Sequence, residues 1–156
     1  MHNQKHDAFY KEYPNLASEL FTEVEIYNPA ANMKHVKTLA IWDTGATISC
    51  ITPGLQKKLG LEPIDSILIE VVNSSEKCDR VLVYVGLPNL ISISNVRPAV
   101  CAFGLSDLEF IIGMDIIKLG DFMISNSYGK TLFSFAIPPL PMKINLADQA
   151  SKINNS

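Results

Sequence analysis

The sequence predicts an all-β domain, built as a small barrel or folded sheet with one or two short helices. The first observation is a series of about nine short segments that are rich in β-branched residues or alternate apolar and polar residues, with turn residues between them. The second is that only two segments, both brief, carry the signals of a helix. The third is size: 156 residues, 47% of them hydrophobic, suffice for one domain with a buried core.

The N-terminal part of the chain predicts a polar arm followed by a hairpin. Residues 1–18 are polar and irregular, which favours a loose arm or a short helical cap. Glu19 to Tyr27 alternates apolar and polar residues, as a half-buried strand does. After a turn signal around Pro29, Val36 to Trp42 predicts a second strand, which is wholly apolar from Leu39 onward. We expect these two strands to pair.

A short helix is expected from Pro53 to Leu59. Thr52 is a suitable N-cap residue, and proline is favoured at the first helical position. Gly60 can end the helix, because glycine readily adopts the left-handed conformation that follows many helices. The helix is therefore predicted to contain one to two turns.

The remaining strands are short β-branched or apolar runs separated by turn residues. They are expected at residues 67–72, 81–85, 90–93, 99–103, 110–112, 122–125 and 131–135. The polar segment 73–79 is expected to be a hairpin tip, and a second short helix is expected at 115–119, ended by Gly120. Prolines from Pro138 onward end the ordered part, so residues 138–156 are expected to form a flexible tail.

Composition argues against several classes of partner. The formal net charge is −3 and the pI is near 5.5, so no basic excess favours nucleic acid. No apolar run reaches the length of about 18 residues that a membrane span needs, and no signal peptide is recognisable, so we expect a cytoplasmic protein. Three widely spaced cysteines argue against a disulfide framework, and no spacing typical of a metal site occurs.

The most informative segment is Leu39 to Thr47, which reads Leu-Ala-Ile-Trp-Asp-Thr-Gly-Ala-Thr. Asp43 directly follows four apolar residues of an expected central strand. A buried carboxylate is unfavourable unless it is hydrogen-bonded, paired or protonated. Gly45 permits a tight turn and a close backbone approach, and Thr44 offers a hydroxyl group that can bond across an interface. Ala46 keeps the loop small. The segment therefore predicts a presented carboxylate.

This pattern resembles the active-site loop of aspartic proteases, in which two apolar residues precede Asp-Thr/Ser-Gly-Ala/Ser. Downstream, Phe110 to Ile117 is similar to the apolar-apolar-Gly segment and short helix that close the domain in the retroviral-type proteases, the retropepsins. The similar order of features extends from Glu19 to Phe135. The resemblance implies that residues 19–137 form a small closed barrel of the acid-protease (retropepsin) type, with aspartic endopeptidase activity and no metal or cofactor.

The chemistry of these enzymes needs two carboxylates that share one proton. One acts as a base on water and the other as an acid toward the carbonyl oxygen, and two carboxylates about 3 Å apart cannot both ionise. The sequence contains one Asp-Thr-Gly, so one chain holds half a site. We expect a homodimer in which Asp43 of each subunit meets its copy at the two-fold axis. By resemblance, Thr44, Gly45 and Ala46 form the active-site loop and dimer interface.

The resemblance also assigns a flap over the bound substrate to Val71 to Val81. Viral flaps are rich in glycine, whereas the residues at this tip are polar and lack glycine: Asn73, Ser74, Ser75, Glu76 and Lys77. The implied substrate is a peptide or unfolded protein bound by strand addition. The glycine-free flap also supports an alternative, a non-catalytic dimeric peptide-binding module on the same fold.

Several of these residues also have a purely structural interpretation. In an unrelated small β-barrel, Asp43 would only cap a turn. Asp115 is expected to cap or charge the first turn of the second helix. Cys50, Cys78 and Cys101 are expected to be small apolar fillers, although Cys78 lies near the flap, where oxidation would affect flap closure.

Overall fold

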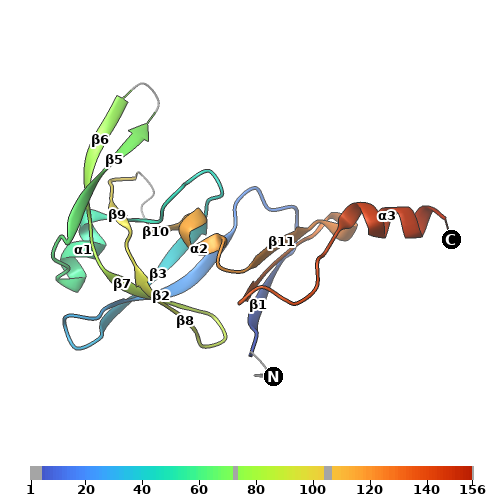
Figure 1. The fold of residues 1–156 in the computed structure, drawn as a ribbon, viewed down its shortest axis with the longest axis horizontal. Coiled ribbons are helices and arrows are strands. Elements are labelled where there is room, and N and C mark those ends of the chain that lie inside the picture. Colours follow the sequence, from blue (N-terminus) through green and yellow to red (C-terminus); the bar gives the residue numbers. More distant parts are fainter. Residues whose placement is uncertain (1–4, 72–73, 104–106, 156) are drawn as a thin grey trace.

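The computed structural model describes residues 5–71, 74–103 and 107–155 (Figure 1). Its helices are α1 (Pro53–Leu59), α2 (Met114–Ile117) and α3 (Leu146–Asn154), with one turn of 3-10 helix, η1 (Ser127–Gly129). Its strands are β1 (Asp7–Tyr13), β2 (Phe21–Asn28), β3 (Lys34–Trp42), β4 (Cys50–Ile51), β5 (Asp65–Val71), β6 (Ser74–Arg80), β7 (Val83–Leu87), β8 (Ile91–Val96), β9 (Ala99–Val100), β10 (Leu108–Ile112), β11 (Asp121–Ser125) and β12 (Thr131–Ile137).

The strands form two sheets, so the predicted all-β class is confirmed. The larger sheet has the order β5-β6-β9-β4-β10-β3-β2-β7-β8, and the smaller has the order β1-β12-β11. The expectation of a closed barrel is corrected in one respect. In the described residues β5 pairs only with β6, and the two project together as a hairpin, so the larger sheet ends there and stays open (Figure 1).

The centre of the larger sheet is the parallel pair β3 and β10. Leu39 to Trp42 lies beside Leu108 to Ile112, and the short β4 pairs antiparallel with the other edge of β10. Strands that are covered on both faces need apolar residues at successive positions, which accounts for the apolar runs from Leu39 to Trp42 and from Phe110 to Ile112. Strand β3 of this pair leads directly into the Asp-Thr-Gly segment.

The predicted hairpin of β2 and β3 is confirmed, with the register from Phe21 opposite Ile41 to Asn28 opposite Lys34. The alternation of apolar and polar residues along β2 places its apolar side chains in the core, where Val24 and Ile26 are buried.

The predicted helix α1 is also confirmed, together with both of its end signals. At its start, the Leu55 backbone N–H donates to the Thr52 hydroxyl at 3.1 Å. After its last residue, Gly60 adopts the left-handed conformation with φ of 67°. The helix is therefore bounded by the two residues that the sequence indicates.

The two ends of the chain differ from the expected arm and tail. Residues 7–13 form strand β1, paired along its whole length with β12, rather than a loose arm or helical cap. Residues 146–154 form α3, capped by the side chain of Asn145 and exposed throughout. The helix extends from the body beyond the smaller sheet (Figure 1). The expected division of the chain into 1–18, 19–137 and 138–156 stays a prediction.

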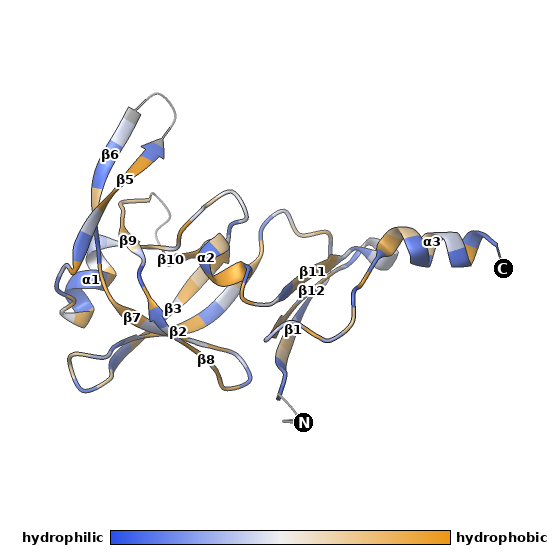
Figure 2. Ribbon diagram, viewed as in Figure 1, coloured by the Kyte–Doolittle hydropathy of each residue, from blue (hydrophilic) through white to orange (hydrophobic). Residues whose placement is uncertain are grey.

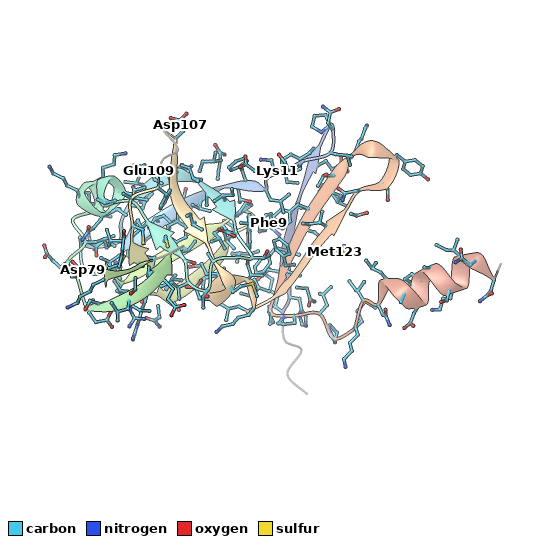
Figure 3. All side chains as sticks on the ribbon, turned by 90° about the horizontal axis from the view of Figure 1, so that it is seen from above. Phe9, Lys11, Asp79, Asp107, Glu109 and Met123 are labelled. Carbon is cyan, nitrogen blue, oxygen red and sulfur yellow. The ribbon has the colours of Figure 1, made fainter. Side chains whose placement is uncertain are left out.

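An aromatic cluster joins the two sheets. Phe9 of β1 contacts Trp42 of β3 with ring centroids 6.2 Å apart, and Phe133 and Phe135 of β12 lie 5.1 and 4.9 Å from the Trp42 ring. Figure 3 shows Phe9 at the junction between the smaller sheet and the rest of the molecule. Burial of Phe9 explains why a polar segment becomes a strand, since the strand carries one aromatic anchor into the core.

Phe133 tests the importance of this cluster. Its side chain is fully buried, so Phe133→Ala is expected to lower the free energy of unfolding by about 3–5 kcal/mol through lost burial and a residual cavity. Urea denaturation followed by tryptophan fluorescence measures this change. The control Tyr128→Ala removes a fully exposed aromatic ring and is expected to stay within about 0.5 kcal/mol of the parent. Equal effects of the two variants would contradict the assigned core.

Candidate active site

Asp43 begins the loop at the end of the central strand β3. Its backbone N–H donates to the Ile112 carbonyl oxygen at 2.9 Å, which continues the pairing of β3 with β10 by one residue. The preceding Trp42 is buried, and its indole N–H donates to the Thr22 hydroxyl at 2.8 Å. The position of Asp43 is therefore fixed by the strand pair on one side and by the aromatic cluster on the other.

The Asp43 carboxylate is held by its own loop. Asp43 Oδ1 accepts a hydrogen bond from the Gly45 N–H at 2.8 Å, and the Ala46 N–H donates to the Asp43 carbonyl oxygen at 3.2 Å. Asp43 and Ala46 are half-buried, whereas Thr44 and Gly45 are exposed. A Cβ atom on Gly45 would lie 3.2 Å from Asp43 Oδ1, so glycine suits this tight contact. The loop presents one partly accessible carboxylate beside an exposed Thr-Gly pair.

Gly113 allows the backbone of β10 and α2 to lie directly under this loop. A Cβ atom at Gly113 would lie 2.6 Å from the Ile48 carbonyl carbon and 2.9 Å from the Ala46 carbonyl oxygen, distances that real Cβ atoms do not tolerate. The close approach lets the Met114 N–H donate to the Ala46 carbonyl oxygen at 2.8 Å. The glycine of the Ile-Ile-Gly pattern is therefore required because a side chain at this position would overlap the backbone of the loop.

Ser49 and Asp115 fasten the far end of the loop. Asp115 Oδ1 accepts hydrogen bonds from the Ser49 N–H at 2.9 Å and from the Ser49 hydroxyl at 2.7 Å. The Ser49 Oγ in turn accepts from the Gly113 N–H at 3.1 Å, and Ser49 is fully buried. Asp115 lies in the first turn of α2, as expected, and Ile116 N–H also donates to it. Sequence reasoning did not single out Ser49, because its partners are more than 60 residues away.

The expected flap is the hairpin of β5 and β6. The prediction of a tip at residues 73–79 is corrected for the described residues: residues 74–80 form strand β6, paired with β5 as far as Val71 opposite Ser74. Ser75, Glu76 and Lys77 are exposed on β6, Ser74 is its first residue, and Asn73 lies outside the described residues. Figure 2 shows β6 as more polar than its neighbour β5. Because polar residues face solvent on both sides of a projecting hairpin, a polar run here can extend as a strand.

The hairpin is anchored at its base by Arg80. The guanidinium group donates to both carboxylate oxygens of Asp65 at 2.7 and 2.6 Å, and it holds the pKa of Asp65 below its ordinary value. The Ile64 N–H donates to the Arg80 carbonyl oxygen at 2.8 Å. These contacts hold the two strands together at the base of the hairpin.

The described residues offer neither a metal cage nor a membrane span. Across residues 5–71, 74–103 and 107–155, no group of three or more His, Cys, Asp or Glu side chains is arranged to hold a metal ion. Among the helices of the same described residues, none combines the length and the apolar character of a membrane span. The feature that stands out at the end of β3 is a carboxylate in a tight loop.

Comparison with solved structures identifies the architecture. A retropepsin-like aspartic protease from Rickettsia conorii is similar over 88% of this chain and 98% of its own, with 18% identity and a TM-score of 0.53. The EIAV protease in complex with an inhibitor is similar over 68% of this chain and 91% of its own, with 21% identity and a TM-score of 0.50. The chain has a retropepsin-like fold. A scan against protein-family models and a search of curated proteins find no match.

The comparison confirms the retropepsin-like fold that the sequence resemblance implied, apart from the closure of the barrel. At identities near 20% the likeness concerns the fold, so the roles of Asp43, Thr44, Gly45 and Ala46 stay predictions. These four residues lie in one loop, and the loop packs on the backbone at Gly113.

Gly113→Ala tests the close packing under the loop. The added methyl group would overlap backbone atoms that cannot move separately, so we expect a loss of about 2 kcal/mol or more in unfolding free energy. The matched control is Gly54→Ala in α1, where a Cβ atom meets nothing nearer than 3.6 Å and helix propensity favours alanine. Chemical denaturation of both variants checks the contrast, which a stable Gly113→Ala protein would contradict.

The tie between Ser49 and Asp115 is tested by a double-mutant cycle. Asp115→Ala leaves the buried Ser49 N–H and hydroxyl without this acceptor, so we expect a loss of about 1–3 kcal/mol. Ser49→Ala and the double variant complete the cycle, measured by urea denaturation. Because the two residues share a hydrogen bond, the double variant should lose less stability than the sum of the single variants. Strict additivity would show that the contact contributes nothing.

Proposed function

We propose that this protein is an aspartic endopeptidase that acts as a homodimer, with a water molecule activated between the Asp43 carboxylates of two subunits. The observation that carries the proposal is the placement of Asp43 at the end of a central strand, in a loop packed on Gly113 and within a retropepsin-like fold. The hydrogen bond from the Gly45 N–H orients one carboxylate oxygen. The half-buried position leaves the group partly accessible to solvent.

The proposed reaction divides two tasks between the two carboxylates. The ionised Asp43 removes a proton from water as the water attacks the carbonyl carbon of the peptide bond. The protonated Asp43 of the other subunit donates its proton toward the carbonyl oxygen, so a tetrahedral intermediate forms without a free ion. Proton transfer to the leaving amine then completes cleavage. Two adjacent carboxylates share one proton because their full ionisation would place like charges side by side.

The need for a second subunit follows from the contents of one chain. Asp43 lies in the single Asp-Thr-Gly sequence, and Asp115 is occupied by Ser49 and by the first turn of α2. Thr44 and Gly45 are exposed in the isolated subunit, which is the surface that a symmetric partner would cover. We therefore place the two-fold axis beside Asp43, with Thr44, Gly45 and Ala46 at the interface.

The proposed substrate is an extended segment of an unfolded protein or peptide. The hairpin of β5 and β6 has strand geometry as far as Val71 and Ser74, so it can offer backbone hydrogen bonds to an extended chain. Its polar residues, among them Glu76 and Lys77, favour contact with polar rather than purely apolar side chains. Three free cysteines fit a reducing compartment, and we propose the cytoplasm as the place of action.

One observation favours a second candidate, a dimeric peptide-binding module without catalysis. The hairpin 65–80 contains no glycine, and glycine is what lets a flap backbone approach a substrate closely. This candidate predicts binding of a peptide without its cleavage. Incubation with one peptide distinguishes the two candidates, because the endopeptidase yields fragments and the binding module leaves the peptide intact.

Asp43→Asn is expected to abolish cleavage of denatured casein at mildly acidic pH. The cleavage rate should fall at least about 1000-fold, because the amide cannot take a proton from water. The variant should keep the dimer, since the side chains have nearly the same shape. Peptide release measured by mass spectrometry and dimer mass measured by light scattering check both statements. The control Glu62→Gln makes the same chemical change at an exposed position and should retain full activity.

A mixing experiment tests whether two copies of Asp43 share one site. An excess of Asp43→Asn subunits should suppress the activity of the parent protein as mixed dimers form, whereas excess Glu62→Gln subunits should not. Activity of the parent should also fall more steeply than its concentration on dilution. A fully active monomer would refute the shared site, and intact peptide that stays bound would favour the non-catalytic module.

A further inference from the structure

The structure brings together three cysteines that are far apart in the sequence. Cys50 lies in β4, Cys78 lies in β6, and Cys101 directly follows β9. The Sγ atoms of Cys78 and Cys101 are 3.8 Å apart, the Cys50 thiol donates to the Ile48 carbonyl oxygen at 3.9 Å, and the Cys101 thiol interacts with Cys50. All three side chains are half-buried, with Cys101 between the other two, and their expected role as small apolar fillers stays a prediction. We refer to Cys50, Cys78 and Cys101 as the thiol cluster.

The backbone register suits a covalent link between Cys78 and Cys101. Strands β6 and β9 pair antiparallel with Arg80 opposite Ala99, and continuing this register by two residues places Cys78 opposite Cys101. Directly opposed residues of an antiparallel pair have Cα atoms about 4.5–5.5 Å apart, and disulfides span about 4.4–6.8 Å between Cα atoms. The two sulfur atoms need to approach by less than about 2 Å to reach bonding distance.

The three thiols differ in reactivity. The hydrogen bond from Cys101 lowers the pKa of Cys50, although burial opposes this shift. Burial, followed by the contact with Cys101, raises the pKa of Cys78 to about 11, and the hydrogen bond to Cys50 raises the pKa of Cys101. Since the thiolate is the nucleophile, Cys50 is the member of the cluster that reacts first with an oxidant.

We propose that the thiol cluster is a thiol–disulfide exchange site that takes a small-molecule disulfide as its substrate and stores the oxidation as a Cys78–Cys101 disulfide. This modification fastens the hairpin of β5 and β6 to the body of the molecule. The inference goes beyond the proposed peptidase activity and does not depend on it, because it rests on the sulfur positions and the strand register.

Each step of the exchange is balanced. The Cys50 thiolate attacks the small disulfide, forms a mixed disulfide and releases one small thiolate. The thiolate of Cys101 then attacks the Cys50 sulfur, which releases the second small thiolate. Finally the thiolate of Cys78 attacks the Cys101 sulfur and returns Cys50 to the thiolate form. In total, Cys78 and Cys101 lose two electrons and two protons, and the small disulfide is reduced to two thiols.

The link has a mechanical consequence for the hairpin. In the reduced protein the ion pair of Arg80 with Asp65 joins the two strands at the base of the hairpin, and the pairing of Arg80 with Ala99 joins the hairpin to the body. A Cys78–Cys101 bond adds a covalent anchor two residues farther toward the tip. The backbone of residues 65–80 should then open less often in the oxidised protein.

The test uses the full chain treated with oxidised glutathione at neutral pH, then alkylated and mapped by mass spectrometry without reduction. The parent protein should yield a peptide pair joined through Cys78 and Cys101, with Cys50 alkylated. Cys101→Ser and Cys78→Ser should remove this pair. Cys50→Ser should form it about 10-fold more slowly, because the two remaining thiols have raised pKa values and contain less thiolate, a loss that their higher nucleophilicity offsets in part.

Hydrogen exchange of the same samples measures the mechanical effect. Residues 65–80 should exchange more slowly in the oxidised parent than in the reduced parent, and Cys78→Ser or Cys78→Ala should show no such difference. Circular dichroism confirms that each variant is folded. Only glutathione adducts, or a Cys50–Cys101 link as the final product, would overturn the proposal, and an unchanged rate in Cys50→Ser would overturn the entry role of Cys50. Because no peptide is cleaved in these measurements, their outcome is separate from that of the peptidase tests.

Discussion

The packing of the loop 43–49 on the backbone at Gly113 is the constraint on which the candidate site depends. Glycine permits contact distances that exclude any side chain, and the contact is completed by hydrogen bonds from Met114 to Ala46 and between Ser49 and Asp115. The loop is therefore held at its middle and at its far end. The strand pair of β3 and β10 holds the remaining end, where Asp43 begins. A carboxylate presented in this way keeps its orientation without support from a bound ligand.

The same strand pair connects the site to the stability of the molecule. Trp42 precedes Asp43 and packs against Phe133 and Phe135, so the smaller sheet is joined to the larger one directly behind the candidate carboxylate. A loss of packing in this aromatic cluster would therefore displace Trp42 and, with it, the adjacent Asp43. The core therefore lies behind the loop, whereas Thr44 and Gly45 on the loop surface are exposed.

The projecting hairpin connects the site with the thiol cluster. Strand β6 meets the body beside β9, and β9 pairs with β4, which leaves the loop containing Asp43. Cys78 lies in the hairpin itself and Cys101 directly follows β9, so a bond between their sulfur atoms would join the hairpin to the body, while Cys50 lies at the start of β4. In the proposed peptidase, the hairpin that covers a peptide and the residues that respond to oxidants would share one short sheet segment.

The sequence by itself determined the elements whose signals lie within a few residues of one another. The cap at Thr52, the left-handed Gly60, the alternation in β2 and the Asp-Thr-Gly turn are local, so each could be predicted before the fold was known. Tertiary structure decided the pairing of β1 with β12, the open edge at β5, the tie of Ser49 to Asp115 and the meeting of three cysteines. These depend on strand register and burial between segments distant in the chain, which no local pattern encodes.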